Sequence, residues 1–170
     1  TTLFRSSGLA VSHENKGVIY AHNDSGDTPR VIALDEKGGL LGELAFGGAK
    51  AKDWEDVAVG PCPNGSCIWV GDIGDNQKTR TEYALYRIDE PVLDGKPFAN
   101  RTVGAQKFPF VYPDGSWNSE TLLVHPTTGE VYVVTKIGMS AAGLYRFPSP
   151  LVADAKITLE KLGTVANTAM

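Results

Sequence analysis

Short alternating runs of apolar and polar residues recur along this chain, separated by turn-rich polar stretches. Three of these runs open in the same way, at Ser7–Val11, Glu55–Val59 and Glu120–Val124. Alternation with a period of two is typical of a β-strand with one buried face. With 19 Gly and 10 Pro between the runs and no amphipathic helix longer than about two turns, the pattern predicts an all-β fold.

Each opening run is followed by two more strand-like runs in the same order. The second runs are Val18–Ala21, Ile68–Gly71 and Val131–Val134, and the third runs are Arg30–Leu34, Tyr83–Ile88 and Gly143–Phe147. Val11 and Val59 are 48 positions apart, and Val59 and Val124 are 65 apart. This spacing is near the ~40–50 residues of a four-stranded propeller blade if the second copy carries an insertion around 94–107.

The repeat therefore predicts a single domain, residues 1–170, built as a β-propeller-like array of about three four-stranded antiparallel blades. The blades would span roughly 5–50, 51–115 and 116–170, with an outer strand at Ile157–Leu162 and a proline-broken edge strand at Phe108–Pro113. Three blades form an incomplete ring, because closed propellers typically use four to eight. We therefore expect a second copy of the chain, most simply in a dimer, or missing blades to close the ring.

Charge and hydropathy exclude two classes of partner. The formal net charge is −4 and the pI is about 5.3, whereas nucleic-acid binding needs a basic patch to neutralise phosphates. No apolar run approaches the ~18 residues of a membrane span. We expect neither nucleic acid nor a membrane span.

Cys62 and Cys67 flank an Asn64-Gly65 turn in a segment that predicts a tight hairpin. A disulfide across this small loop is the favoured interpretation, and it predicts an oxidising location, secreted or periplasmic. A zinc pair is the weaker alternative, because no second Cys or His pair occurs at ligand spacing.

Acidic and amide residues gather in two kinds of loop. In a four-stranded meander, the loop leading into the first strand and the loop joining the second and third strands emerge on the same face. The residues in these loops are Asn23, Asp24, Asp27, Asp53, Glu55, Asp56, Asp72, Asp75, Asn76 and Glu120. The topology predicts one acidic face.

Calcium is the sharpest hypothesis for this face, because Ca²⁺ prefers carboxylate, amide and backbone oxygens. The predicted metal ligands are Glu55, Asp56, Asp72, Asp75 and Asn76. The alternative is turn chemistry, since Asp, Asn and Gly are also the ordinary residues of tight turns.

Glu55 and Glu120 begin successive first strands, which makes them the candidate general acid and base of a hydrolase. The alternative is that both cap strands. Further candidates for ligand binding are His22, Asn23, Asp24, Trp54, Arg80 and Lys136. No Gly-x-Ser-x-Gly elbow and no defensible Ser-His-Asp order occurs, so a serine nucleophile is not predicted.

The segments Asp53–Ala58, Trp69–Asn76 and Tyr86–Pro91, with Arg80 between them, carry a family resemblance. Together they resemble secreted bacterial β-propellers of the phytase-like and esterase-like-of-phytase kind, over nearly the whole chain. Most members of that group lack an assigned reaction. More distantly similar phytase propellers bind calcium with carboxylates on one face and hydrolyse phosphate esters there.

This chain departs from the phytase pattern in one respect. The obvious cations near the acidic loops are Lys78, Arg80 and Lys136. Three cations are few for a site that binds phosphate. Two functions follow as expectations: a secreted binding or scaffold module with an acidic, calcium-binding face, or a calcium-dependent phosphoesterase or related hydrolase. The sequence offers carboxylates but no nucleophile and no cluster of cations, which favours the binding or scaffold module. The fold alone does not distinguish the two functions.

Overall fold

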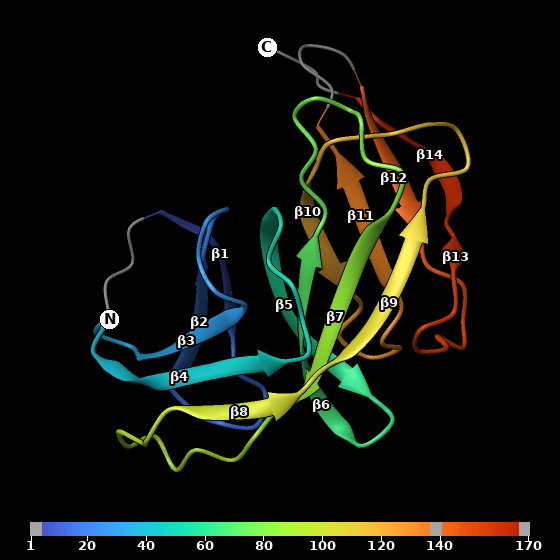
Figure 1. Ribbon diagram of the computed structural model, residues 1–170. Helices are drawn as coiled ribbons and strands as arrows, with labels where there is room; N and C mark the ends of the chain where they lie inside the picture. The colour runs from blue at the N-terminus through green and yellow to red at the C-terminus, as the bar shows by residue number, and fades with distance from the viewer. Residues whose placement is uncertain (1–4, 137–140, 167–170) are drawn as a thin grey trace.

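The computed structural model describes residues 5–136 and 141–166, which fold into β-strands connected by turns and loops (Figure 1). These residues contain no α-helix, and therefore no helix long and apolar enough to cross a membrane. The all-β prediction is confirmed. The strands form three sheets, each built around an antiparallel four-stranded meander.

The first sheet holds β1 (Ser6–Val11), β2 (Val18–Asn23), β3 (Arg30–Asp35), β4 (Leu40–Gly47) and β8 (Arg101–Gly104). The second holds β5 (Trp54–Cys62), β6 (Gly65–Asp72), β7 (Tyr83–Asp89), β9 (Gln106–Val111) and β13 (Ile157–Thr158). The third holds β10 (Ser119–Val124), β11 (Val131–Thr135), β12 (Ala142–Arg146) and β14 (Glu160–Val165). The strands follow one another in chain order within and between the three sheets, except for β8 and β13.

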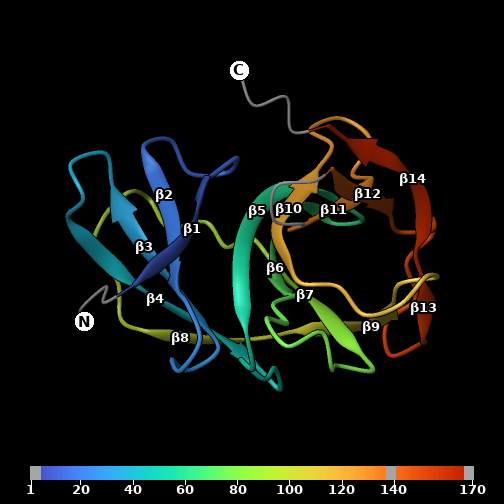
Figure 2. The same cartoon turned by 90° about the horizontal axis from the view of Figure 1, so that it is seen from above.

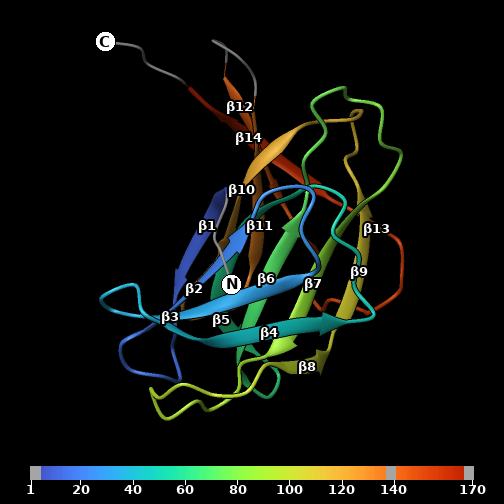
Figure 3. The same cartoon turned by 60° about the vertical axis from the view of Figure 1, so that its left-hand side comes forward.

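Strands β8 and β13 each leave their own group and add to the outer edge of the preceding sheet. The connection from β7 to β9 supplies β8, which pairs in parallel with β4. The connection from β12 to β14 supplies β13, which pairs in parallel with β9 (Figure 3). The predicted insertion around 94–107 thus contains a strand that joins the second repeat to the first sheet.

Two strand predictions are wrong because β13 joins the second sheet. Ile157–Leu162 is not one outer strand, because it divides at Leu159 between two sheets, and the Leu159 side chain is buried between them. The proline-containing Phe108–Pro113 run is not an edge, because β13 covers the outer side of β9.

The first strands of the three sheets lie side by side, with β5 between β1 and β10 (Figure 2). The backbones of these first strands lie so close together that glycine is needed at two positions. A Cβ on Gly8 would lie 2.8 Å from the Val57 backbone nitrogen, and a Cβ on Gly60 would overlap Val124. One end of these strands therefore collects loops from all three sheets.

Two apolar clusters fill the space between the sheets. The first includes Tyr20, Phe46 and Trp54, and the second includes Trp69 and Phe110. Burying such large side chains supplies roughly 1.5–3 kcal/mol each, so these clusters stabilise the packing of the sheets.

The Cys62–Cys67 disulfide is present, as predicted, at the hairpin that joins β5 and β6. The two Cα atoms are 5.8 Å apart. Gly65 in this turn has φ +119°, a conformation that other residues rarely adopt.

Candidate functional site

The predicted acidic residues lie at the end of the sheets where β2 and β6 finish and β5 and β10 begin. Asp24 follows β2, Asp53 and Glu55 stand at the start of β5, Asp72 ends β6, and Glu120 is in β10. The structure brings them together in two separate groups with different partners.

Asp24, Asp53 and Glu55 form the group that has the spacing of a metal site. One carboxylate oxygen from each lies within 4.8 Å of the others. Gly74, in the loop after β6, makes room for them, because a Cβ there would overlap Asp53 Oδ2 and Glu55 Oε1. We call these three residues the carboxylate cluster.

Asp53 and Glu55 have no hydrogen-bond or ion-pair partner for their carboxylates among the described residues, although Glu55 is 7% exposed. Burial raises the pKa of Glu55 to about 8, with further contributions from Glu120, Asp53 and Asp24. Burial also raises the pKa of Asp53, and the neighbouring Asp24 adds to the effect. The cluster therefore holds more negative charge than its surroundings stabilise.

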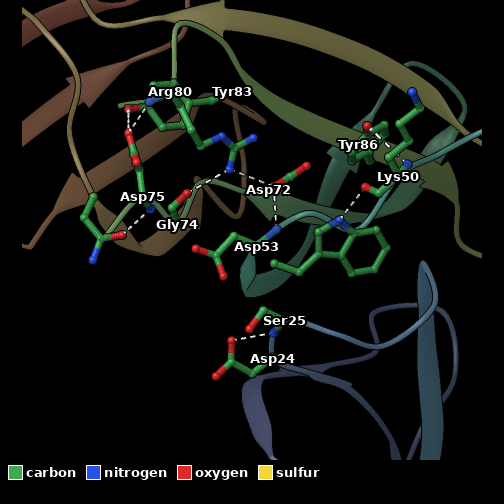
Figure 4. Close-up of polar contacts among 12 residues, drawn as sticks. Asp24, Ser25, Lys50, Asp53, Asp72, Gly74, Asp75, Arg80, Tyr83 and Tyr86 are labelled. Atoms are coloured by element: carbon green, nitrogen blue, oxygen red, sulfur yellow. Dashed lines mark hydrogen bonds and ion pairs between the residues drawn. The ribbon is translucent and has the colours of Figure 1, made fainter. Parts of the chain in front are cut away.

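Asp24 is the member of the carboxylate cluster whose carboxylate has hydrogen-bond partners. Its Oδ2 accepts a hydrogen bond from Arg5 at 2.5 Å, and its Oδ1 accepts one from the Ser25 amide at 2.5 Å. Figure 4 shows Asp24 on its loop facing Asp53, with the second acidic group beyond Asp53. Arg5 is a largely exposed side chain, so it screens the cluster only weakly.

Glu120 lies beside the cluster but has partners of its own. Its Oε1 accepts hydrogen bonds from Lys136 Nζ at 3.1 Å and from Asn118 Nδ2 at 3.0 Å. Lys136, predicted to bind ligand, is therefore committed to Glu120. Glu55 and Glu120, the predicted acid and base, interact electrostatically across this face.

Asp72 belongs to the second group and is neutralised. Arg80 Nη1 lies 2.9 Å from Asp72 Oδ1 and also donates to the Gly74 carbonyl at 2.8 Å, and both side chains are buried. Asp72 Oδ1 additionally accepts the Asp53 amide at 3.0 Å. This buried ion pair fixes the loop that carries Gly74, so Asp72 and Arg80 position the cluster rather than join it.

Asp75 is occupied by its own loop. Burial would raise its pKa, but hydrogen bonds from the Arg80 and Thr79 amides and from the Tyr83 hydroxyl lower the pKa below its usual value. Asn76 is exposed and its Oδ1 accepts a bond from Asn118 at 3.3 Å. For these two predicted metal ligands the structure favours turn chemistry.

Asp56 points away from Glu55 and links two sheets. Its oxygens accept the amides of Val57 at 2.9 Å and of Leu122, in β10, at 2.8 Å. Burial raises the pKa of Asp56 to about 6, and the two amide bonds limit the rise. This predicted ligand is corrected to a structural connection between β5 and β10.

The remaining ligand-binding candidates are largely buried. Trp54 is 2% exposed, packs in a T-shaped contact with Phe46 and donates Nε1–H to the Lys50 carbonyl, so it is a core residue and not the predicted ligand-binding residue. His22 is fully buried, its Nδ1 contacts the Asn23 carbonyl, and burial lowers its pKa. Asn23 donates to Asp27 at 2.7 Å within its turn.

Comparison with known proteins gives no family. A scan against protein-family models and a search of curated proteins both found no match. The resemblance to phytase-like propellers, which rests on Asp53–Ala58, Trp69–Asn76 and Tyr86–Pro91, stays a prediction.

Of the three cluster members, Glu55 alone was among the predicted metal ligands; Asp24 was predicted to bind ligand, and Asp53 was placed on the acidic face without a role. Strand alternation could not have identified Asp53, because it lies just before β5 and the register of β5 shifts between Trp54 and Asp56. The cluster can therefore bind a hard cation through three carboxylates, or share protons among them.

Proposed function

We propose that this protein is a binding module whose carboxylate cluster holds one calcium ion. The observation that carries the proposal is the convergence of Asp24, Asp53 and Glu55 within 4.8 Å, with two of the three carboxylates unpartnered among the described residues. Burial, and then repulsion from the neighbouring carboxylates, raise the pKa of Glu55, and a divalent cation would relieve the repulsion.

The donor set fits calcium better than the other common metals. All three ligands are carboxylates, and Ca²⁺ accepts such oxygens at roughly 2.3–2.6 Å in flexible geometry, with water completing the shell. Zinc and copper prefer His or Cys, which are absent from the cluster. Mg²⁺ demands a stricter octahedron and keeps more of its water, so it should bind more weakly here.

We further infer that the three sheets are blades of a propeller-like array. The side-by-side first strands support this arrangement, as does the shared pattern in which one blade lends an outer strand to the blade before it. The resemblance to phytase-like propellers is consistent with it. In such an array the carboxylate cluster would lie near the axis, at the start of β5.

The outermost sheets leave apolar faces for a partner, which we propose to be a second copy of the chain or further blades. On the first sheet, Val11, Ile19, Leu34 and Leu40 form one cross-strand row, and Val11 is 66% exposed. On the third, Leu123 is 48% exposed. Faces of this kind are usually covered.

A second copy would have to pack through these faces without lending a strand. In the second and third sheets, the connection between the third and fourth strands supplies the lent strand, β8 or β13. In the first sheet the equivalent connection, from β3 to β4, is a tight turn that ends at Gly39 and is too short to supply one. Light scattering at micromolar concentration tests this partner: a dimer mass supports the second copy, and a monomer mass leaves the faces to other blades.

The disulfide supports an extracellular or periplasmic location, because such bonds persist in oxidising compartments. We propose that location for this module. It also suits calcium binding, since extracellular modules bind Ca²⁺ at roughly 10⁻⁴–10⁻³ M, within reach of external concentrations.

A calcium-dependent phosphoesterase or related hydrolase is the second candidate. It is favoured by one observation: a carboxyl with a pKa of about 8, Glu55, lies near the carboxylate of Glu120, a combination used in acid–base catalysis. Against it, Arg80 and Lys136 are both engaged in ion pairs. Hydrolysis of p-nitrophenyl phosphate with calcium, lost in Glu55→Gln, would support the hydrolase.

A thermal melt of chelator-treated protein tests the calcium proposal. At ten times the dissociation constant, binding to the folded state stabilises it by about 1.4 kcal/mol, which raises Tm by roughly 3–6 °C in a chain of this size. Magnesium at the same concentration is the control and should raise Tm less. Equal melting temperatures in calcium and in chelator would count against the site.

A further inference from the structure

A second site lies at the opposite end of the strands from the carboxylate cluster. A pocket of about 290 Å³ opens there between the second and third sheets. Its walls are the β5–β6 hairpin, the β10–β11 turn at Thr128 and Gly129, and the segment Ser149–Leu151. The pocket is separate from the residues of the proposed function.

The walls are held together by close packing. Gly129 has φ +71°, and a Cβ at this position would lie 2.8 Å from the Pro61 carbonyl oxygen. The hairpin carrying Pro61 is also closed by the disulfide of Cys62 and Cys67. The pocket is thus formed before any ligand arrives, which reduces the entropic cost of binding.

Arg87 is the one charged side chain among the described residues that line the pocket. Its guanidinium lies over the rings of Trp69, at 4.9 Å, and Phe108, at 5.1 Å. Its Nε and Nη2 both donate to Gln106 Oε1, the neighbouring residue across the sheet. Nη1 donates to no acceptor within the described chain, so its hydrogens are available to an external acceptor.

Trp69 provides a second donor without an acceptor. The side chain is 1% exposed and lines the same pocket, and its Nε1–H has no hydrogen-bond partner among the described residues. Buried indole donors are normally paired, so an unpaired one calls for an explanation. Burial also lowers the pKa of Arg87, and the nearby Asp89 offsets this only in part.

We propose that this pocket binds the carboxylate of a small molecule that has an apolar body. Arg87 pairs with the carboxylate, the Trp69 ring supports the guanidinium, and the prolines and Leu151 contact the apolar part. A single guanidinium on an aromatic platform suits a planar carboxylate, whereas a phosphate group is usually held by several cations or amides. The site takes an anion, although the protein as a whole is acidic.

Titration with benzoate, followed by ¹H–¹⁵N NMR of the Trp69 indole Nε1–H, tests this site in the whole chain. We expect a saturable shift of that signal with a dissociation constant of roughly 1–10 mM, as is usual for a ligand this small. Benzamide has the same shape without the charge and should bind at least tenfold more weakly. Inorganic phosphate should not displace benzoate at equal concentration.

Arg87→Gln should weaken benzoate binding at least tenfold, and Arg87→Lys should retain part of it. Arg101→Gln is the matched control, because Arg101 also stacks on a ring, that of Phe98, but in the first sheet. The rest of the NMR spectrum reports whether each variant is folded. Unchanged binding in folded Arg87→Gln, equal binding of benzamide, displacement by phosphate, or no shift of the Trp69 signal up to 20 mM benzoate would each overturn the proposal.

Discussion

Replacing Glu55 by Gln should make the protein more stable at neutral pH when calcium is absent. Glu55 keeps its proton in the folded state up to a pKa of about 8, whereas the ordinary value is 4.5. A carboxyl whose folded pKa is raised contributes stability below its unfolded pKa, and that stability is lost as pH rises toward the folded pKa. Gln has the same shape but does not ionise, so the variant does not lose this stability as pH rises.

The size of the effect follows from the two pKa values. Between pH 4.5 and pH 7 the folded protein holds a proton that the unfolded chain releases, which amounts to roughly 3 kcal/mol at 1.36 kcal/mol per pH unit. Water at the mouth of the cluster screens the charges, so we expect about half of this, ~1.5 kcal/mol. For a chain of this length that corresponds to a rise in Tm of about 3–6 °C.

Thermal melts of wild type and Glu55→Gln in chelator, from pH 4.5 to pH 8.5, provide the assay. The two curves should meet near pH 4.5 and separate as pH rises, with the variant above the wild type. Calcium should then stabilise the wild type and leave the variant unchanged. Glu36→Gln, at an exposed acid away from the cluster, is the control and should follow the wild type. A Glu55→Gln variant less stable than wild type at pH 7 in chelator would refute the reasoning.

Three further predictions concern the support of the site. Arg80→Gln leaves Asp72 buried without its ion partner and should cost about 3–5 kcal/mol of unfolding free energy in urea with chelator. The loss should be larger in calcium, because the cluster loses its support; an equal loss in both conditions would contradict a positioning role. Asp56→Ala removes the acceptor for two amides and should cost about 2–3 kcal/mol in the same assay, and a loss below about 0.5 kcal/mol would show that the link between sheets is unimportant. Reductant should lower the stability of wild type by about 2 kcal/mol and leave Cys62→Ser/Cys67→Ser unaffected, whereas equal sensitivity would place the effect elsewhere.

Local pattern was enough to predict most strands, because their alternation and turn residues are properties of short windows. It was not enough to predict which sheet a strand joins. Ile157–Leu162 has the composition of a single strand, yet its two halves pair with β9 and β12. That division depends on a parallel pairing of β13 with β9, which is distant in sequence and leaves no local signal.

The candidate site shows the same limit. Topology predicted that the loops before the first strands and after the second strands share one face, and Asp24, Glu55 and Glu120 do lie there. The residue types could not distinguish a free carboxylate from a neutralised one. Asp72 is paired with Arg80, and Asp75 accepts hydrogen bonds from amides of its own loop, so neither is free to bind a metal. Both sets of contacts depend on side-chain geometry.

A calcium titration by calorimetry on chelator-treated protein tests the central claim most directly. We predict one calcium ion per chain in wild type, binding at least tenfold weaker in Asp53→Asn, and unchanged binding in Asp27→Asn, whose carboxylate bonds Asn23 and Arg30 outside the cluster. No calcium binding by wild type at millimolar concentration, or equally tight binding by folded Asp53→Asn, would contradict the assignment of the carboxylate cluster as a calcium site.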